Sequence, residues 1–119
     1  MSATDELRRS VAQLNIDLLR WGLVTWTSGN VSARLPDSNL LVIKPSGVSY
    51  DDLTPESMVV CDLDGNLVAG DLAPSSDTAA HAYVYRAMPD VGGVVSSSVV
   101  VSGVVLVFSL LPALSWVMV

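Results

Sequence analysis

Asn30-Val31-Ser32-Ala33-Arg34-Leu35 alternates polar and apolar side chains, which is the period of a β-strand. Pro36-Asp37-Ser38-Asn39 has the composition of a turn, and Leu40-Leu41-Val42-Ile43-Lys44 is a second short apolar run. The pattern predicts two strands that pair as a hairpin. Because a hairpin joins antiparallel neighbours, we expect the sheet around it to be antiparallel or mixed.

A helix is predicted before this hairpin, over residues 4–21. Its apolar residues recur at spacings of three and four and form one stripe, Leu7, Val11, Leu14, Leu18 and Trp21. Thr4 is the expected N-cap, and Gly22 is the expected end of the helix.

Shorter elements follow the hairpin. Residues 58–63 and 67–69 read as a second pair of strands. Ser76 or Asp77 is expected to cap a second helix, which Pro89 ends. Hairpin-linked strands between two helices predict an α/β fold.

The composition excludes some classes of function. The net charge is −6 and the isoelectric point is about 4.3, whereas nucleic-acid-binding proteins need a basic surface. Residues 1–9 are polar and charged, so no secretory signal is predicted and the cytoplasm is the expected location. Cys61 is the single cysteine, and we expect it to be buried because its neighbours are apolar.

Three turns rich in glycine and serine are the candidate binding elements. They are Thr27-Ser28-Gly29-Asn30-Val31-Ser32, Lys44-Pro45-Ser46-Gly47 and Pro74-Ser75-Ser76-Asp77-Thr78. Each offers backbone N–H groups and hydroxyls with little side-chain bulk. Such turns suit a loop that wraps a phosphate or a polyhydroxylated substrate.

The motifs around these turns resemble, in order and spacing, the class II aldolase/adducin family. They include Gly29-Asn30-Val31-Ser32, Lys44-Pro45-Ser46-Gly47 and Gly92-Gly93-Val94-Val95, and the resemblance covers about residues 5–95. Within the family, the chain most resembles the L-ribulose-5-phosphate 4-epimerases. Asp77 follows the serine pair here, where the fuculose-phosphate aldolases usually carry Glu.

The resemblance implies a three-layer α/β/α fold with a mainly antiparallel sheet, incomplete in this chain. Residues 1–95 would form the class II aldolase-like part, and residues 96–119 a divergent apolar tail. A zinc-dependent enzyme of sugar phosphates is implied, and Asp77 matches the acidic residue of its metal site. The implied substrate-binding residues are Gly29, Asn30, Lys44, Ser46, Gly47, Ser75 and Ser76.

The sequence departs from the family after Val95. The family has a His-x-His pair there, whose imidazoles bind zinc, and this chain has Ser96-Ser97-Ser98. A serine hydroxyl is a poor zinc ligand. The one histidine, His81, is not at a ligand position, and we expect it on the helix surface or partly buried. We therefore expect no bound zinc and no measurable epimerase activity.

The tail carries no charge, because no Asp, Glu, Lys or Arg follows Asp90. Three interpretations stay open: a truncated or altered gene end, a transmembrane segment, and strands that complete the sheet. The run exceeds the ~20 residues that span a bilayer, although Ser96–Ser98 and Pro112 dilute its apolarity. Val99–Val101 and Val104–Phe108 favour strands.

Three functions are predicted on this basis. The first is a sugar-phosphate epimerase that converts L-ribulose 5-phosphate to D-xylulose 5-phosphate, as a truncated and inactive copy. The second is a class II sugar-phosphate aldolase of the fuculose-phosphate type, and the third is a non-catalytic module like the adducin branch. The implied partner is a pentulose phosphate or a related sugar phosphate. Whether this chain forms the family's homotetramer stays open.

Overall fold

The computed structural model describes residues 2–22, 29–36, 38–96, 105–109 and 116–118, the last two ranges by their backbone. One sheet of seven antiparallel strands has the order β4-β3-β2-β1-β5-β6-β7. The strands are β1 (Asn30–Arg34), β2 (Leu40–Ile43), β3 (Val59–Asp62), β4 (Leu67–Ala69), β5 (Val91–Ser96), β6 (Val105–Ser109) and β7 (Trp116–Met118). The helices are α1 (Ala3–Arg20) and α2 (Thr78–Ala87), with short 3-10 turns η1 (Tyr50–Asp52) and η2 (Pro55–Ser57).

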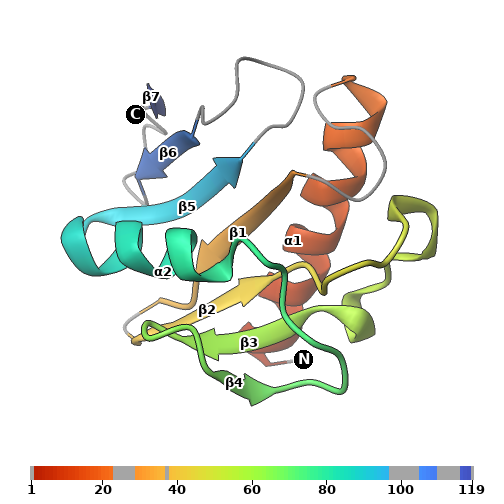
Figure 1. The fold of residues 1–119 in the computed structure, drawn as a ribbon, viewed down its shortest axis with the longest axis horizontal. Coiled ribbons are helices and arrows are strands. Elements are labelled where there is room, and N and C mark those ends of the chain that lie inside the picture. The colour runs from red at the N-terminus through yellow and green to blue at the C-terminus, as the bar shows by residue number, and fades with distance from the viewer. Residues whose placement is uncertain (1, 23–28, 37, 97–104, 110–115, 119) are drawn as a thin grey trace.

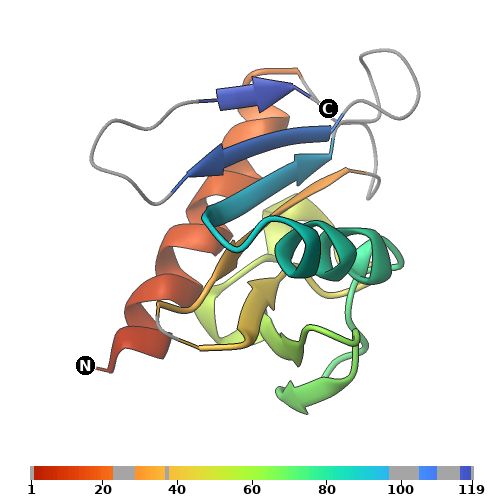
Figure 2. The same cartoon turned by 90° about the vertical axis from the view of Figure 1, so that its left-hand side faces the viewer.

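The two helices cover opposite faces of the sheet, so the molecule has three layers. Figure 1 shows α2 in front of the sheet and α1 behind it, and Figure 2 shows the same layers from the side. This arrangement confirms the predicted α/β/α architecture with an antiparallel sheet.

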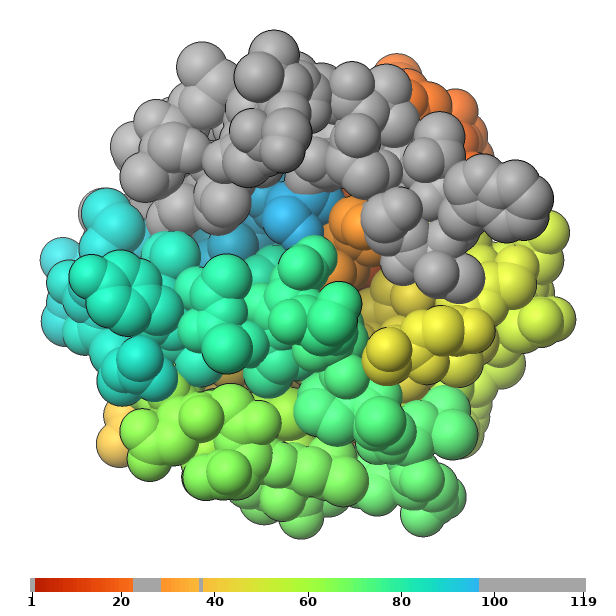
Figure 3. Space-filling view, in the orientation of Figure 1, coloured from red at the N-terminus to blue at the C-terminus, as the bar shows by residue number. Residues whose placement is uncertain are grey.

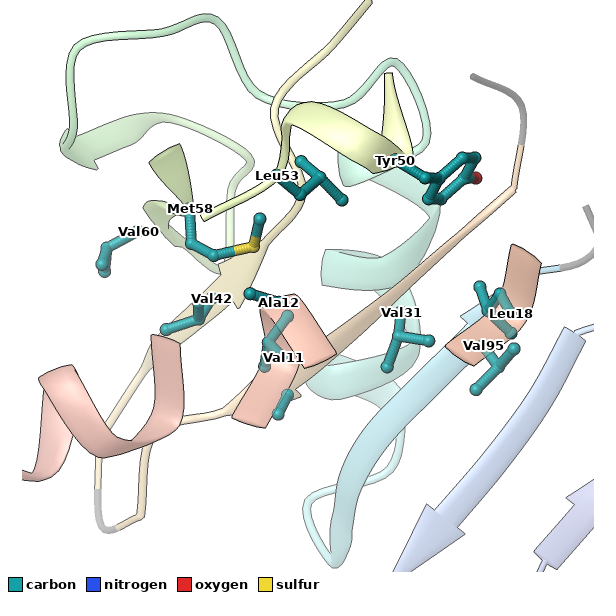
Figure 4. Close-up of a cluster of buried hydrophobic side chains, with 11 residues drawn as sticks. Val11, Ala12, Leu18, Val31, Val42, Tyr50, Leu53, Met58, Val60 and Val95 are labelled. Carbon is teal, nitrogen blue, oxygen red and sulfur yellow. The ribbon is translucent and has the colours of Figure 1, made fainter. Parts of the chain in front are cut away.

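Each layer boundary has its own hydrophobic core, because strand residues alternate between the two faces. The core under α1 is shown in Figure 4 and contains Val11, Ala12, Leu18, Val31, Ala33, Val42, Tyr50, Leu53, Met58, Val60 and Val95. The core under α2 contains Leu41, Ile43, Val59, Cys61, Ala82, Tyr85, Val91 and Val94. Cys61 is fully buried, as predicted.

Helix α1 differs from its prediction at its start and on its buried face. Ser2, not Thr4, caps it, in a capping box with Asp5. The predicted stripe is also too long, because Leu14 is 41% exposed and Trp21 is 74% exposed. Asn15 replaces them on the buried face.

The Asn15 side chain joins α1 to β1. Its Nδ2 donates to the carbonyl oxygens of Val11 and Val31, at 2.8 Å and 3.1 Å, and its Oδ1 accepts the Val31 N–H at 2.9 Å. A buried amide satisfied in this way fixes which face of the helix meets the sheet.

Both predicted hairpins are present. β1 pairs with β2, and β3 pairs with β4, each antiparallel. Beyond Ser96, β6 and β7 extend the sheet, in agreement with the interpretation that the tail adds strands. The predicted strand residues 99–101 lie outside the described part of the chain. Within that part, none of the helices has the length and apolarity that crossing a membrane requires.

Candidate functional site

Two of the three candidate turns are joined through their backbones. The Ser46 N–H donates to the carbonyl of Ala73 at 2.8 Å, and the Ser75 N–H donates to the carbonyl of Lys44 at 3.0 Å. Together they form an isolated antiparallel bridge between Pro45 and Pro74. The second and third turns therefore lie side by side although about thirty residues separate them in sequence.

Asn30 brings the described part of the first turn, residues 29–32, to the same place, while Thr27 and Ser28 lie outside the described residues. The Asn30 side chain is 2% exposed, and Nδ2 donates both to Ser75 Oγ and to Asp77 Oδ2, each at 2.9 Å. The preceding Gly29 accepts a hydrogen bond from the Tyr50 hydroxyl through its carbonyl oxygen. Figure 3 shows the start of β1 in orange between the 44–50 segment in yellow and the turn before α2 in green.

The structure thus brings together all seven predicted substrate-binding residues and Asp77. Gly29 and Gly47 have φ values of +89° and +72°, a backbone region that favours glycine. The Ser46 and Ser76 side chains are exposed. Within the described part of the chain, no hydrogen bond uses either hydroxyl. These two serines are therefore available to a ligand.

The predicted N-cap position of α2 is confirmed at Asp77, but its carboxylate does not make the capping hydrogen bond that the prediction implies. Asp77 stands at the N-cap position with φ −84° and ψ −1°, and its side chain makes no capping hydrogen bond. The turn is closed instead by Ser75, whose Oγ accepts the Asp77 N–H at 3.2 Å and whose carbonyl accepts the Thr78 hydroxyl at 2.6 Å. The carboxylate is consequently free to face β1 and β5.

Ser96 is the second residue that contacts this carboxylate. Asn30 and Ser96 are register partners in β1 and β5, and Ser96 Oγ donates to Asp77 Oδ2 at 3.1 Å. Ser96 occupies the first position of the expected His-x-His pair, so this position does lie beside Asp77. Ser97 and Ser98 lie outside the described residues.

Lys44 is buried beside the turns rather than extended into them. It is 1% exposed, its Nζ donates to the Pro45 carbonyl at 3.1 Å, and it lies 5.1 Å from the centroid of the Tyr50 ring. Burial lowers the pKa of Lys44. Burial also raises the pKa of Tyr50 to about 12, with a further contribution from the charge of Asp77.

His81 is a correction to the sequence interpretation. It is 1% exposed rather than on the helix surface, and its Nδ1 lies 2.6 Å from Ser32 Oγ. Sequence reasoning also missed Tyr50 as a neighbour of the site. Its only signal was proximity in sequence to the second turn.

A zinc site needs several strong ligands, and the described residues do not supply them. Asp77 offers a carboxylate, but Ser96 and Asn30 are poor zinc ligands. Among the residues that the structure describes, no group of three or more His, Cys, Asp or Glu side chains could hold a metal ion. The donor set present here therefore does not fit zinc.

Comparison with known proteins identifies the fold. The profile of the family described as Class II Aldolase and Adducin N-terminal domain matches residues 9–105. An L-fuculose 1-phosphate aldolase is 26% identical over 77% of this chain, with a TM-score of 0.72. The L-fuculose-1-phosphate aldolase of Thermus thermophilus is 29% identical over 79%, with a TM-score of 0.62.

A third similar structure is YgbL from Escherichia coli, a candidate aldolase, epimerase or decarboxylase. It is 28% identical over 81% of this chain, with a TM-score of 0.73. The chain spans 43%, 47% and 45% of the lengths of these three proteins, in the order given. Because the family profile covers most of the sequence and the fold agrees, the chain belongs to the class II aldolase and adducin N-terminal domain family.

Proposed function

We propose that the three joined turns bind a sugar phosphate, as the substrate-binding part of a class II aldolase-type site. The observation that carries this proposal is the Asn30 side chain, which ties the first turn to Ser75 and Asp77 of the third. Two structural neighbours are named L-fuculose 1-phosphate aldolases, which supports a sugar phosphate as the ligand class.

The charge of Asp77 sets the orientation of the ligand. A phosphate next to this carboxylate would be repelled, so we place the phosphate at the Ser46 and Ser76 hydroxyls and the Gly47 N–H. The sugar hydroxyls would then lie near Asp77, which can accept their hydrogen bonds. The exposed serines supply neutral donors for the phosphate oxygens.

Two reactions are candidates, epimerisation of a sugar phosphate and its aldol cleavage. Epimerases and aldolases of this family both break a carbon–carbon bond beside a carbonyl group. The names of the neighbours favour a fuculose-phosphate substrate, whereas Asp77 favours L-ribulose 5-phosphate and epimerisation. Because the described residues do not fit zinc, we derive no step through a metal. The absence of zinc and of epimerase activity stays a prediction, which tightly bound zinc in metal analysis would contradict.

A non-catalytic binding module is the second candidate function. The contact between Ser96 and Asp77 favours a binding module. The Ser96 hydroxyl donates to the Asp77 carboxylate at the position where the family has a zinc-binding imidazole. Product analysis separates the two functions. Conversion of L-ribulose 5-phosphate or cleavage of L-fuculose 1-phosphate would establish an enzyme, and binding without either product would establish a module.

The binding proposal is tested by titration of ¹⁵N-labelled protein with L-fuculose 1-phosphate and L-ribulose 5-phosphate. We expect saturable shifts of the Gly47 and Ser76 amide signals. Ser76→Ala should weaken binding by roughly 10- to 150-fold, the effect of one hydrogen bond to a charged group. Ser10→Ala, an exposed serine on α1, is the matched control. Equal shifts with unphosphorylated L-fuculose, or none with either phosphate, would overturn the proposal.

A further inference from the structure

Behind the proposed site, β1 and α2 are joined by a row of polar contacts. Alternate residues of β1 contact residues four apart in α2 and the turn before it. We call this row the polar seam, and its pairs are Asn30 with Asp77, Ser32 with His81, and Arg34 with Tyr85. The spacing matches because two strand residues rise about 6.6 Å and four helix residues about 6 Å.

The hydrogen-bond donors at the centre of the seam can be assigned. Ser32 Oγ lies 2.6 Å from His81 Nδ1 and 2.7 Å from the Tyr85 hydroxyl. Tyr85 and Ser32 each have one hydroxyl proton to give. If Tyr85 donates to Ser32, then Ser32 donates to Nδ1, and both hydroxyls are satisfied.

The opposite assignment is less favourable. If Nδ1 carried the proton and donated to Ser32, one of the two hydroxyl protons, that of Ser32 or that of Tyr85, would have no acceptor among the described residues. Each buried unsatisfied group costs roughly 1–3 kcal/mol. Nδ1 is therefore the acceptor. Because burial lowers the pKa of His81 to about 4, the ring is neutral at pH 7, and its proton is on Nε2.

Two buried atoms of the seam have no partner in the described part of the chain: His81 Nε2 and Asn30 Oδ1. One is a donor by the assignment above, and the other is an acceptor. They belong to neighbouring contacts of the seam, and the charge of Asp77 acts on the His81 ring. A single water molecule can accept from one group and donate to the other.

We propose that one buried water accepts a hydrogen bond from His81 Nε2 and donates one to Asn30 Oδ1, and that His81 is thereby a positioning residue for the Asn30 amide. The water fixes which end of the amide is Oδ1, so that Nδ2 faces Ser75 and Asp77. This role rests on the proposed function only because Asn30 and Asp77 belong to the proposed site.

The tautomer of His81 tests the first half of the proposal. His81 is the only histidine, so a long-range ¹H–¹⁵N correlation spectrum of the ¹⁵N-labelled full chain contains one imidazole. At pH 7 we expect the neutral ring with its proton on Nε2, and a cross-peak between that proton and bound water. A proton on Nδ1, a cationic ring, or a missing water cross-peak would overturn the proposal.

Ser32→Ala tests how the tautomer is set. The variant removes the donor to Nδ1, so we expect the single Nε2–H form to be replaced by a mixture and the Asn30 side-chain amide signals to shift. Ser10→Ala is the matched control and should leave both unchanged. An unaltered tautomer in folded Ser32→Ala would contradict the assignment. If this variant does not fold, the wild-type spectrum still decides.

These outcomes are independent of ligand binding. A failed sugar-phosphate titration with the expected tautomer and water overturns the proposed function and leaves the seam assignment standing. Specific binding of a sugar phosphate by a protein whose His81 proton is on Nδ1 does the reverse.

Discussion

Asn30 and Ser96 face each other across β1 and β5, and both donate to the same oxygen, Oδ2 of Asp77. The turn before α2 is therefore held to the ends of two strands at once. Because Asn30 also donates to Ser75, the shape of the proposed site depends on the register of the sheet. Loss of these hydrogen bonds should reduce stability as well as binding.

The adjacent serines of the third turn separate these two effects. Ser75 is buried and its Oγ accepts from Asn30 Nδ2 and from the Asp77 N–H, whereas Ser76 is exposed. We expect Ser75→Ala to lower the free energy of unfolding by about 1–3 kcal/mol. Ser76→Ala should change it by less than about 0.5 kcal/mol. Urea unfolding measures both, and equal losses would contradict the geometry.

The local elements of the fold were predictable from the sequence. The period of residues 30–35 and the Pro36–Asn39 turn predicted the β1–β2 hairpin. Helix α1 was predicted with the wrong cap and with two exposed residues, Leu14 and Trp21, in its apolar stripe. The periodicity is read from apolar residues alone, so it cannot identify a buried polar residue such as Asn15.

The polar seam was not predictable, although the turns were. Ser32 and His81 are 49 residues apart in sequence, and their contact depends on how α2 is laid over β1. A lone histidine on a helix carries no local sign of burial. The missing capping bond of Asp77 was not predictable for the same reason, because the partners of its carboxylate, Asn30 and Ser96, come from strands distant in sequence.

The buried His81 predicts a loss of stability in mild acid. Burial lowers its pKa from 6.5 to about 4, while Asp77 opposes the shift. Between these values the unfolded chain binds a proton and the folded chain does not, so the free energy of unfolding falls as the pH drops from 6.5 to about 4. The expected loss is on the order of 3 kcal/mol. Urea unfolding at several pH values in this range measures it.

His81→Gln is the control for that loss. The substitution removes the titrating ring, so the free energy of unfolding should no longer fall between pH 6.5 and 4. Asp5 and Asp62, whose pKa values are lowered by hydrogen bonds from Ser2 and Asn66 respectively, contribute stability that is lost as the pH falls below 3.8. The pH range in which these two groups change the stability therefore lies below the range of His81. A slope that persists in His81→Gln would assign the loss to other groups.

Cys61 is expected to react slowly in the folded protein. It is fully buried, and burial, with the nearby charge of Asp62, raises its thiol pKa to about 11. Little thiolate is present at pH 8, and a reagent must wait for the protein to open. Labelling by a thiol reagent should be much faster in concentrated urea than in buffer. Equal rates in both would show that Cys61 is accessible in the folded state.

Two glycines with positive φ should respond differently to alanine. At Gly47 (φ +72°) an added Cβ would meet nothing within 4 Å, so Gly47→Ala is opposed by the backbone conformation alone, at about 1–2 kcal/mol. At Gly70 (φ +124°) the Cβ would lie 2.9 Å from Val59 Cγ1 and 3.3 Å from its Cα. Val59 is fully buried and has no room to retreat, so Gly70→Ala adds a steric clash to the same strain. We expect Gly70→Ala to shift the urea midpoint at least twice as far as Gly47→Ala. The reverse order would show that β4 does not lie against β3 as described.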